Sequence, residues 1–259
     1  FSEYFKYNHL YPMASSIWSS PINKIPAFPF KEFVNFFANH GLLRIFNRPK
    51  WRTVEGGSRA YVEKVLNNKK IRSYKGHKAT AFINKKGIWE INFNNKVKKY
   101  DHLILAVHSN QVINILKNYK KSSLKIFSNI KYNKNVVFLH SDQKLMPKRQ
   151  KVWASWNYIE NKSEISVSYW MNKLQNLNTN KNFFVTLNPP FKPDSEKVER
   201  QIVYEHPMYD FNTFGTQKKI QSMQGKDNLW FCGAYLGYGF HEDGIKSGIQ
   251  VAEKLLNNF

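Results

Sequence analysis

The chain has 259 residues, of which 40 are Lys or Arg and 18 are Asp or Glu, so its formal net charge is +22. Hydrophobic residues make up 42% and aromatic residues 16% of it. This composition excludes a disordered basic tail and allows one large domain or two connected ones. The single cysteine, Cys232, excludes an internal disulfide and fits a reducing compartment such as the cytoplasm. No stretch approaches the ~20 apolar residues that span a bilayer.

The positive charge has two interpretations. It would suit a polyanion such as nucleic acid or an anionic membrane surface. However, the lysines are spread along the whole chain and are accompanied by 29 Asn, which favours a compositional bias of tolerant surface positions. We therefore expect no nucleic-acid partner and keep peripheral membrane contact as the one functional use of the charge.

The first half of the chain begins with aromatic residues at helical spacing. In Phe30 to Phe37 (FKEFVNFF), four phenylalanines fall on one face, which predicts an amphipathic helix ending near His40-Gly41. Gly56-Gly57-Ser58 then precedes a second predicted helix, Arg59 to Leu66. Such a junction aims unpaired backbone amides at an electron-rich group, although a Gly pair before a helix is common.

Short strand-like segments follow. Ala79 to Ile83 and Ile88 to Phe93 alternate as a β-hairpin or meander does, with Lys85-Lys86-Gly87 as the turn. The apolar run HLILAV, residues 102–107, predicts a strand buried on both faces, as in a parallel sheet. VINILKNY, residues 112–119, predicts a helix.

The middle of the chain is predicted to form one mixed or antiparallel sheet. A polar turn is expected at Ile159 to Ser163, and Asn188-Pro189-Pro190 should end the sheet. The candidate strands are Val136 to His140, Lys151 to Trp156, Glu164 to Trp170 and Phe183 to Leu187.

The last forty residues predict a strand, a glycine-rich loop and a helix. Asn228 to Cys232 is the strand, and Ile245 to Leu256 has the apolar spacing of a helix. This geometry aims amides and a helix dipole at a phosphate. The loop GYGFHEDG nevertheless lacks the spacing of G-x-G-x-x-G, so it is not the primary dinucleotide-binding turn, and a loop without any ligand remains an alternative.

Other chemistry has little support in the sequence. His241-Glu242-Asp243 has no metal-ligand spacing, so we expect no metal site. There is no G-x-S-x-G, and Cys232 ends an apolar strand, which is typical of a buried small residue. No catalytic base or nucleophile stands out, which indicates that a cofactor carries the chemistry.

The C-terminal segment WFCGAYLGYGFHEDGIKSGIQVAEKL resembles the flavin-binding segment of the flavin amine oxidase, protoporphyrinogen oxidase and phytoene desaturase superfamily. More narrowly, RPKWRTVEGGSRAYV, LAVHSNQ, KVWASWNY, SYWMNKLQ, TLNP and EHPMYD resemble a bacterial branch of predicted NAD/FAD-binding proteins, related to a domain joined to cyclopropane fatty acid synthase in plants. The resemblance runs from about Leu10 to Leu255 and implies FAD as the cofactor.

The resemblance also implies which residues contact FAD. It places Gly56, Gly57 and Ser58 at a turn close to the flavin and the backbone of Ala79 at the adenine. Ala79 replaces a usual Val and Asn110 a usual Asp, which leaves any side-chain role at position 110 in doubt. The C-terminal residues that it places beside the cofactor are Gly233, Ala234, Tyr235, Gly239, Phe240, Asp243, Gly244 and Ile245.

Proteins of this superfamily begin with a βαβ unit that carries G-x-G-x-x-G. The chain opens at Phe1, inside the resemblance, so we expect it to be a fragment whose partner is the missing N-terminal FAD-binding segment. The expected fold is mixed α/β, the C-terminal part of a two-domain FAD/NAD(P)-binding fold with a partial parallel sheet, a meander and a mixed-sheet substrate domain with helices. Residues 1–50 and 112–215 are assigned to the substrate domain, and residues 51–111 and 216–259 to the FAD domain.

The leading functional hypothesis is therefore an FAD-dependent oxidoreductase, whose flavin accepts a hydride from an apolar, fatty-acyl-like substrate. Aromatic residues such as Trp18 and Trp153 would line its pocket, or else form the core. The first alternative is a non-enzymatic basic domain that binds anionic lipid or nucleic acid. The second alternative is an inactive remnant of a flavoenzyme.

Overall fold

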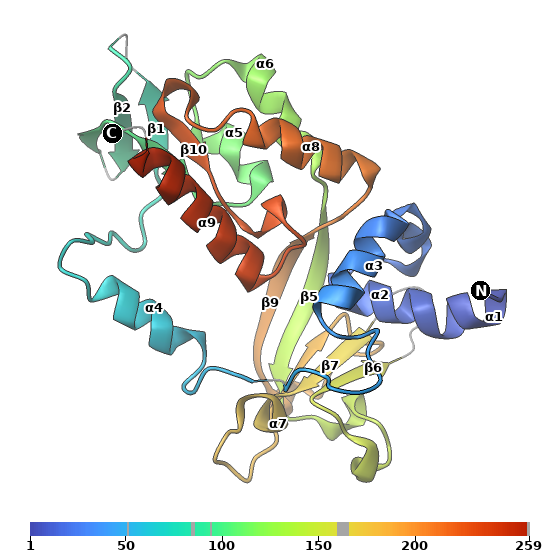
Figure 1. Ribbon diagram of the computed structural model, residues 1–259. Coiled ribbons are helices and arrows are strands. Elements are labelled where there is room, and N and C mark those ends of the chain that lie inside the picture. The colour runs from blue at the N-terminus through green and yellow to red at the C-terminus, as the bar shows by residue number, and fades with distance from the viewer. Residues whose placement is uncertain (51, 84–85, 94, 160–165, 258–259) are drawn as a thin grey trace. The chain divides into compact units, whose positions relative to one another are not determined.

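A computed structural model describes residues 1–50, 52–83, 86–93, 95–159 and 166–257 (Figure 1). The chain divides into two compact units. The first contains Phe1–Ser73 and Asn133–His206, and the second contains Tyr74–Tyr132 and Pro207–Phe259. The assignment of four sequence segments to FAD and substrate domains stays a prediction.

The first unit combines helices with a five-stranded sheet of order β6-β7-β8-β5-β9. The paired neighbours among β5 to β8 are antiparallel, which confirms the predicted mixed or antiparallel sheet. The strands are β5 (Tyr132–His140), β6 (Trp156–Ile159), β7 (Ser166–Trp170), β8 (Phe184–Leu187) and β9 (Val198–Pro207). The helices are α1 (Glu3–Phe5), a π-helical turn (Lys6–Leu10), α2 (Tyr11–Trp18), α3 (Phe30–Asn39), α4 (Ser58–Leu66) and α7 (Met171–Gln175).

Two predictions for this unit need correction. The strand predicted at Lys151 to Trp156 is a loop with a short 3₁₀ turn, and the strand β6 begins at Trp156. The loop is fixed because the Trp153 indole donates to the carbonyl of Pro147 and the Ala154 amide donates to the side chain of Asn157. Ile159, predicted as the start of a turn, ends β6. The rest of that turn, and residues 164–165 of the next predicted strand, lie outside the described residues.

The second unit contains the meander and the parallel strand pair. Strands β1 (Thr80–Ile83), β2 (Trp89–Phe93) and β3 (Lys96–Tyr100) are consecutive antiparallel neighbours, which confirms the predicted meander; residues 84–85 of its first turn are outside the described residues. Strand β4 (Leu103–Leu105) pairs in parallel with β10 (Leu229–Phe231). The helices are α5 (Val112–Ile115), α6 (Lys121–Leu124), α8 (Phe211–Gln221) and α9 (His241–Leu256).

The helix predicted over residues 112–119 stops after one turn. Leu116 leaves the helix with extended backbone because it forms a parallel bridge with Ala81, and the Lys117 amide donates to the carbonyl of Ala81. Leu116 is buried in the core of this unit, so burial against the meander outweighs helix propensity at this point. The remaining short 3₁₀ turns of the chain are Ile22–Ala27, Ser109–Gln111, Lys125–Asn129, Gln143–Leu145, Gln150–Val152, Ser195–Lys197, Lys226–Asn228 and η9 (Ala234–Leu236).

The core of the second unit lies on both sides of β10. Leu229 and Phe231 point into a cluster that includes Trp89 and Phe127. On the other side, Trp230 packs with Val251 of α9. Strand β4 is not buried on both faces in the same way, since the side chain of Ile104 is 47% exposed. The prediction that residues 102–107 are buried on both faces is therefore wrong at that position.

Candidate functional site

The candidate site lies where the two parallel strands of the second unit end. Leu229, Trp230 and Phe231 of β10 stand opposite Leu103, Ile104 and Leu105 of β4. The Cys232 amide continues the ladder by donating to the carbonyl of Leu105. Parallel strands end at one edge of their sheet, so the segment after β4 and the glycine-rich turn after β10 emerge together. Ligands of open α/β sheets bind at such an edge.

Three glycines of this turn have no room for a side chain. A Cβ at Gly233 would lie 2.8 Å from the ring of Tyr235, and one at Gly239 would lie 2.7 Å from the hydroxyl of Tyr209. At Gly237 a Cβ would lie 2.4 Å from the carboxylate of Asp243. Gly239 also has φ +95°, which side chains rarely adopt. Close packing, in addition to backbone freedom, thus requires glycine here.

Hydrogen bonds fix the turn against two helices. The Ser247 hydroxyl of α9 accepts from the Gly233 amide at 2.9 Å and donates to the Gly244 carbonyl at 2.8 Å. The Gln217 side-chain amide of α8 donates to the Gly237 carbonyl at 2.8 Å and to the Tyr235 carbonyl at 3.0 Å. The turn is therefore preorganised by groups behind it.

Asp243 holds the start of α9. Its carboxylate accepts from the Phe240 amide at 2.9 Å, a capping bond within the first turn of the helix. The helix begins at His241, four residues earlier than Ile245, so Asp243 and Gly244 are inside it. Gly244 faces the Ala234 amide, 3.7 Å from where its Cβ would be. The structure brings together all eight C-terminal residues predicted to contact FAD, on one stretch of turn and helix start.

Buried phenols lie behind the turn. Tyr235 is 3% exposed and its hydroxyl has no hydrogen-bond partner among the described residues. Burial, with Tyr132 and Cys232 nearby, raises the pKa of Tyr235. Burial and the nearby Asp243 likewise raise the pKa of Tyr209. Both phenols are therefore neutral at physiological pH and add no negative charge beside an anionic ligand.

The segment after β4 is ordered by a third tyrosine. The Tyr132 hydroxyl accepts from the amide of Ser109 at 2.9 Å, and the rings of Tyr132 and His108 stack at 5.0 Å. Ser109 is fully buried. Asn110, where the resemblance leaves a side-chain role in doubt, follows on the exposed surface.

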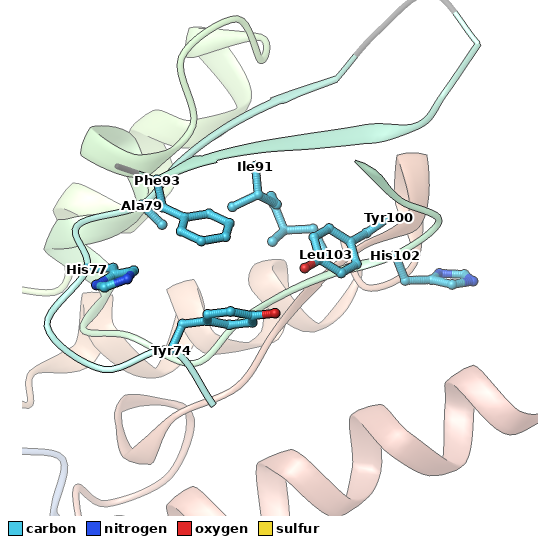
Figure 2. Close-up of a pocket in the computed structure, with 8 residues that line it drawn as sticks. All are labelled: Tyr74, His77, Ala79, Ile91, Phe93, Tyr100, His102 and Leu103. Atoms are coloured by element: carbon cyan, nitrogen blue, oxygen red, sulfur yellow. The ribbon is translucent and has the colours of Figure 1, made fainter. Parts of the chain in front are cut away.

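A second feature of this unit is a pocket of about 300 Å³ against the meander (Figure 2). Ala79, the predicted adenine contact, lines it. The rings of Tyr74 and Phe93 are 5.3 Å apart, and the Lys98 ammonium lies 4.2 Å from the Tyr74 ring centroid. An aromatic pocket with a cation beside it suits a planar, electron-rich ring. The other lining residues are His77, Ile91, Tyr100, His102 and Leu103.

The predicted contacts Gly56, Gly57 and Ser58 belong to the first unit, whereas the contacts described above belong to the second. Both glycines have positive φ, +75° and +70°, and they precede α4 as predicted. The Gly57 amide donates to the carbonyl of Val54, which closes a turn. A Cβ at Gly57 would meet nothing within 4 Å.

Nucleophilic and metal chemistry gain no support here. Burial raises the pKa of the Cys232 thiol, so it is not a thiolate. Glu242 pairs with Lys246 at 3.4 Å, and Asp243 caps α9. Within the described ranges, no three His, Cys, Asp or Glu side chains are arranged to hold a metal ion. In the same part of the chain, no helix combines the length and apolarity that a bilayer crossing requires.

Ser247, Gln217 and Tyr209 were not among the residues predicted to form the site, although Ser247 and Tyr209 lie in segments that carry the resemblance. Ser247 lies on the buried side of α9, three residues after Gly244, and a small hydroxyl at that helical spacing from a glycine turn is the signal that could have found it. Gln217 and Tyr209 are distant in sequence from the turn that they support. No local pattern predicts that either residue supports this turn.

No model of a known protein family matches the chain, and no curated protein matches it. Solved structures do share its fold. One is a CLA-producing fatty acid isomerase from P. acnes, with 15% identity over 76% of this chain and a TM-score of 0.51. A second, from an Exiguobacterium species, is assigned as a protoporphyrinogen oxidase, with 11% identity over 96% of this chain and a TM-score of 0.61. A third is a reduced UDP-galactopyranose mutase, with 14% identity over 100% of this chain and a TM-score of 0.64.

The chain spans 52%, 63% and 66% of the lengths of these three proteins. At such identities the likeness shows the fold alone. The expected mixed α/β fold is confirmed, and the matched structures include a protein assigned to one of the enzyme families that the sequence resembles. The chain thus shares its fold with these three proteins.

Proposed function

We propose that this chain is part of an FAD-dependent oxidoreductase and that the glycine-rich turn after β10 faces the cofactor. The observation that carries the proposal is the position of this turn at the carboxyl edge of two parallel strands, where close packing of Gly233, Gly237 and Gly239 fixes it. Ligands of open α/β sheets bind at such an edge. The first turn of α9 adds backbone amides that have no partner within the helix, and such amides favour an anionic group.

The residues present fit FAD at two places. The turn at residues 233–245 would hold the flavin and its pyrophosphate, and the pocket that contains Ala79 would hold the adenine, beside rings such as Tyr74 and Phe93. Gly56, Gly57 and Ser58 are proposed as further flavin contacts, on the ground of the resemblance alone. When bound, FAD accepts a hydride from the substrate.

The chain's own residues would position the cofactor and exclude water from it. Ser247 and Gln217 hold the turn in one conformation, so that little order has to be gained on binding. Tyr235 and Tyr209 keep the space behind the turn apolar and uncharged. Asp243 is committed to capping α9 and is not a proton acceptor for the reaction.

A fatty-acyl or other apolar substrate is the finer part of this proposal. It is supported by the plant lipid-synthase relationship within the resemblance and by one structural neighbour named as a fatty acid isomerase. The aromatic residues expected to line an acyl pocket include Trp18 and Trp153, which are 5% and 6% exposed and pack against other rings. For those two, the described structure favours a role in the core.

We also propose that a further polypeptide segment, the expected N-terminal FAD-binding βαβ unit, completes the second unit. Parallel sheets are normally covered on both faces, yet Ile104 of β4 is half exposed. On α9, Ile245, Ile249 and Leu256 form a helical stripe that is 51–69% exposed. An added strand beside β4, with its helix, would bury both.

Purification of this chain alone, and of a protein extended by the residues encoded ahead of Phe1, tests the proposal. The extended protein should be yellow and carry one FAD per chain, and this chain alone should be colourless. An extended protein that carries no flavin, with no G-x-G-x-x-G among its added residues, would sink the proposal in favour of a basic binding domain.

A further inference from the structure

A buried row of polar side chains crosses three consecutive strands of the first unit. It joins His140 of β5 to Thr186 of β8 and Ser168 of β7. All three residues are 0% exposed. Nε2 of the His140 ring lies 2.7 Å from the Thr186 hydroxyl, and this hydroxyl lies 2.6 Å from that of Ser168. Polar groups this deeply buried are costly unless each donor has an acceptor.

The contacts at the two ends of this row fix the direction of its hydrogen bonds. Ser168 donates its one hydroxyl proton to the carbonyl of Leu145 at 2.8 Å, so Thr186 has to donate to Ser168 and accept from His140. At the other end, the Asp142 amide donates to Nδ1 of His140 at 3.1 Å. Nε2 therefore carries the ring proton and Nδ1 carries none, so the buried imidazole is neutral.

Both ends of the row hold the same loop, residues 142–146. His140 binds the amide at its start, and Ser168 binds the Leu145 carbonyl near its end. Leu145 and Met146 are 1% and 5% exposed. Met146 packs in a cluster with Trp153. The loop is therefore docked on the sheet by apolar packing and by a hydrogen bond that requires an unprotonated Nδ1.

The charged groups around His140 belong to the loop and to the segment before β9. They are Asp142 and Lys144 on the loop, and Asp194 and Lys197 on the segment. The Asp142 carboxylate is already occupied, because it accepts from the amides of Lys144 at 3.1 Å and Asp194 at 3.0 Å. Lys197 is paired with Asp194 at 3.6 Å.

The strands beside β5 bring no further charge to the ring. Strand β8 contains no charged residue. Tyr169 of β7 follows Ser168 directly, and by strand alternation its side chain faces the other side of the sheet. On β9, Glu199 is paired with Lys181 at 2.6 Å. A proton on His140 would thus find Asp142 as the one acidic side chain that attracts it among the described residues.

We infer that residues 142–146 form a latch released by a proton: neutral His140 holds this loop on the sheet, and protonation of Nδ1 opens it. A proton on Nδ1 would face the N–H of Asp142, so that hydrogen bond has to break. The charged ring then needs water, which only opening of the loop supplies. Opening would expose Leu145 and Met146. The inference concerns the first unit alone and does not depend on a bound flavin, so it can fail while the proposed function stands.

The pH window of the latch follows from the two states of His140. Burial lowers its pKa to about 4 in the closed state, against the attraction of Asp142. In the open state water restores the ordinary pKa of 6.5, so the open state binds the proton more tightly. The open fraction should therefore rise about twentyfold from pH 7 to pH 5. Burial opposes ionisation of Asp142, but the bonds from two backbone amides hold its pKa below the ordinary value, so it stays ionised across this window.

The experiment is hydrogen–deuterium exchange of this chain at pH 7, 6 and 5, corrected for the intrinsic exchange rate at each pH. Protection of the amides of residues 142–146 should fall about twentyfold between pH 7 and pH 5. The matched comparison is residues 171–182 of the same unit, which contain no His, Asp or Glu. Their protection should change by less than about twofold. Constant protection at 142–146, or an equal fall at 171–182, would overturn the inference.

Two substitutions separate the proton from the hydrogen bonds of the latch. His140→Gln should make the protection of 142–146 independent of pH to within about twofold. Ser168→Ala loses the bond to the Leu145 carbonyl, so it should lower that protection about tenfold at every pH and keep the pH dependence. A pH dependence that survives in His140→Gln, or disappears in Ser168→Ala, would contradict the inference.

Nitrogen NMR of the unsubstituted chain tests the latch without relying on a variant to fold. At pH 7 the ring of His140 should carry its proton on Nε2, as the row of hydrogen bonds requires. A proton on Nδ1, or a doubly protonated ring at pH 7, would overturn the inference.

Discussion

Two glycine turns were expected at one cofactor, and they differ in how they are held. The turn after β10 is packed so closely that Gly237 and Gly239 cannot accept a Cβ, and Ser247 and Gln217 bond it from behind. The turn before α4 has positive φ at Gly56 and Gly57 but open space around Gly57. The first turn is therefore fixed by side chains packed against it, whereas the second is open at Gly57. Glycine is required by packing in one place and by backbone conformation in the other.

The largest expected effect is a pH dependence of stability in the sheet of the first unit. It distinguishes this sheet from residues 43–73 of the same unit. His140 of β5 is fully buried, and burial lowers its pKa from 6.5 to about 4. The unfolded chain therefore binds a proton that the folded chain rejects. Stability from this group is fully present above pH 6.5 and is lost as the pH falls towards 4, by about 3 kcal/mol.

Urea unfolding at several pH values between 7 and 4 checks this. His140→Gln should flatten the pH dependence, and His9→Gln, at an exposed position, should not. After correction for the intrinsic exchange rate at each pH, the protection of the sheet amides should fall as the pH drops towards 4, whereas amides of 43–73 should have little protection throughout. An unchanged pH slope in His140→Gln would contradict this account of the sheet.

The next largest loss of stability is expected for substitutions in the turn after β10. Gly237→Ala should destabilise the protein by roughly 2–3 kcal/mol, because the added methyl would overlap the Asp243 carboxylate. Asp243→Ala alone loses the bond to the Phe240 amide and should cost about 1 kcal/mol. Without the carboxylate the methyl no longer overlaps it, so the double variant should lose less stability than the two single losses added together. The difference should be at least about 1 kcal/mol. Additive losses in chemical unfolding would mean that the two residues do not touch.

A smaller effect tests the hydrogen bonds behind the turn. Ser247→Ala leaves the buried Gly233 amide without its acceptor, so it should cost about 1–2 kcal/mol. Ser128→Ala removes a comparable hydroxyl bond at an exposed position and should change the free energy of unfolding by less than about 0.5 kcal/mol. Equal changes in the two variants would show that the turn is not held by Ser247.

The smallest effect on stability is expected at the other turn. Gly57→Ala places a methyl in open space, and the exposed turn can relax to another conformation without breaking buried contacts. The free energy of unfolding should fall by about 1 kcal/mol, because a residue other than glycine is strained at φ +70°. FAD affinity of the extended protein should nevertheless fall. A loss as large as that of Gly237→Ala would show that both turns are packed, and the contrast between them would disappear.

The hydrophobic periodicity of the sequence correctly predicted those helices and strands whose tertiary contacts favour the same conformation. Helices α3 and α4, the meander, β8 and β10 were all expected from periodicity. It failed where a distant partner decides the conformation. Leu116 bridges to Ala81 and ends α5 early. Trp153 anchors a loop whose sequence pattern predicts a strand.

The candidate site was predictable in part for the same reason. The residues of 233–245 are contiguous, so a motif could mark them together. Gln217 and Tyr209 support that motif from distant segments, where only the fold reveals their role, whereas Ser247 supports it from the same helix. The aromatic pocket around Ala79 likewise gathers residues from several strands and loops.

The most direct test of the central claim is hydrogen–deuterium exchange of the extended protein with and without FAD. FAD should slow exchange in two stretches, residues 233–245 and 54–60, and leave β6 to β8 of the first unit unchanged. The turn at 54–60 is exposed and the turn at 233–245 is already packed, so binding orders the first more than the second. Protection from exchange should therefore rise more at 54–60 than at 233–245. FAD bound with no added protection at residues 233–245 would contradict the account.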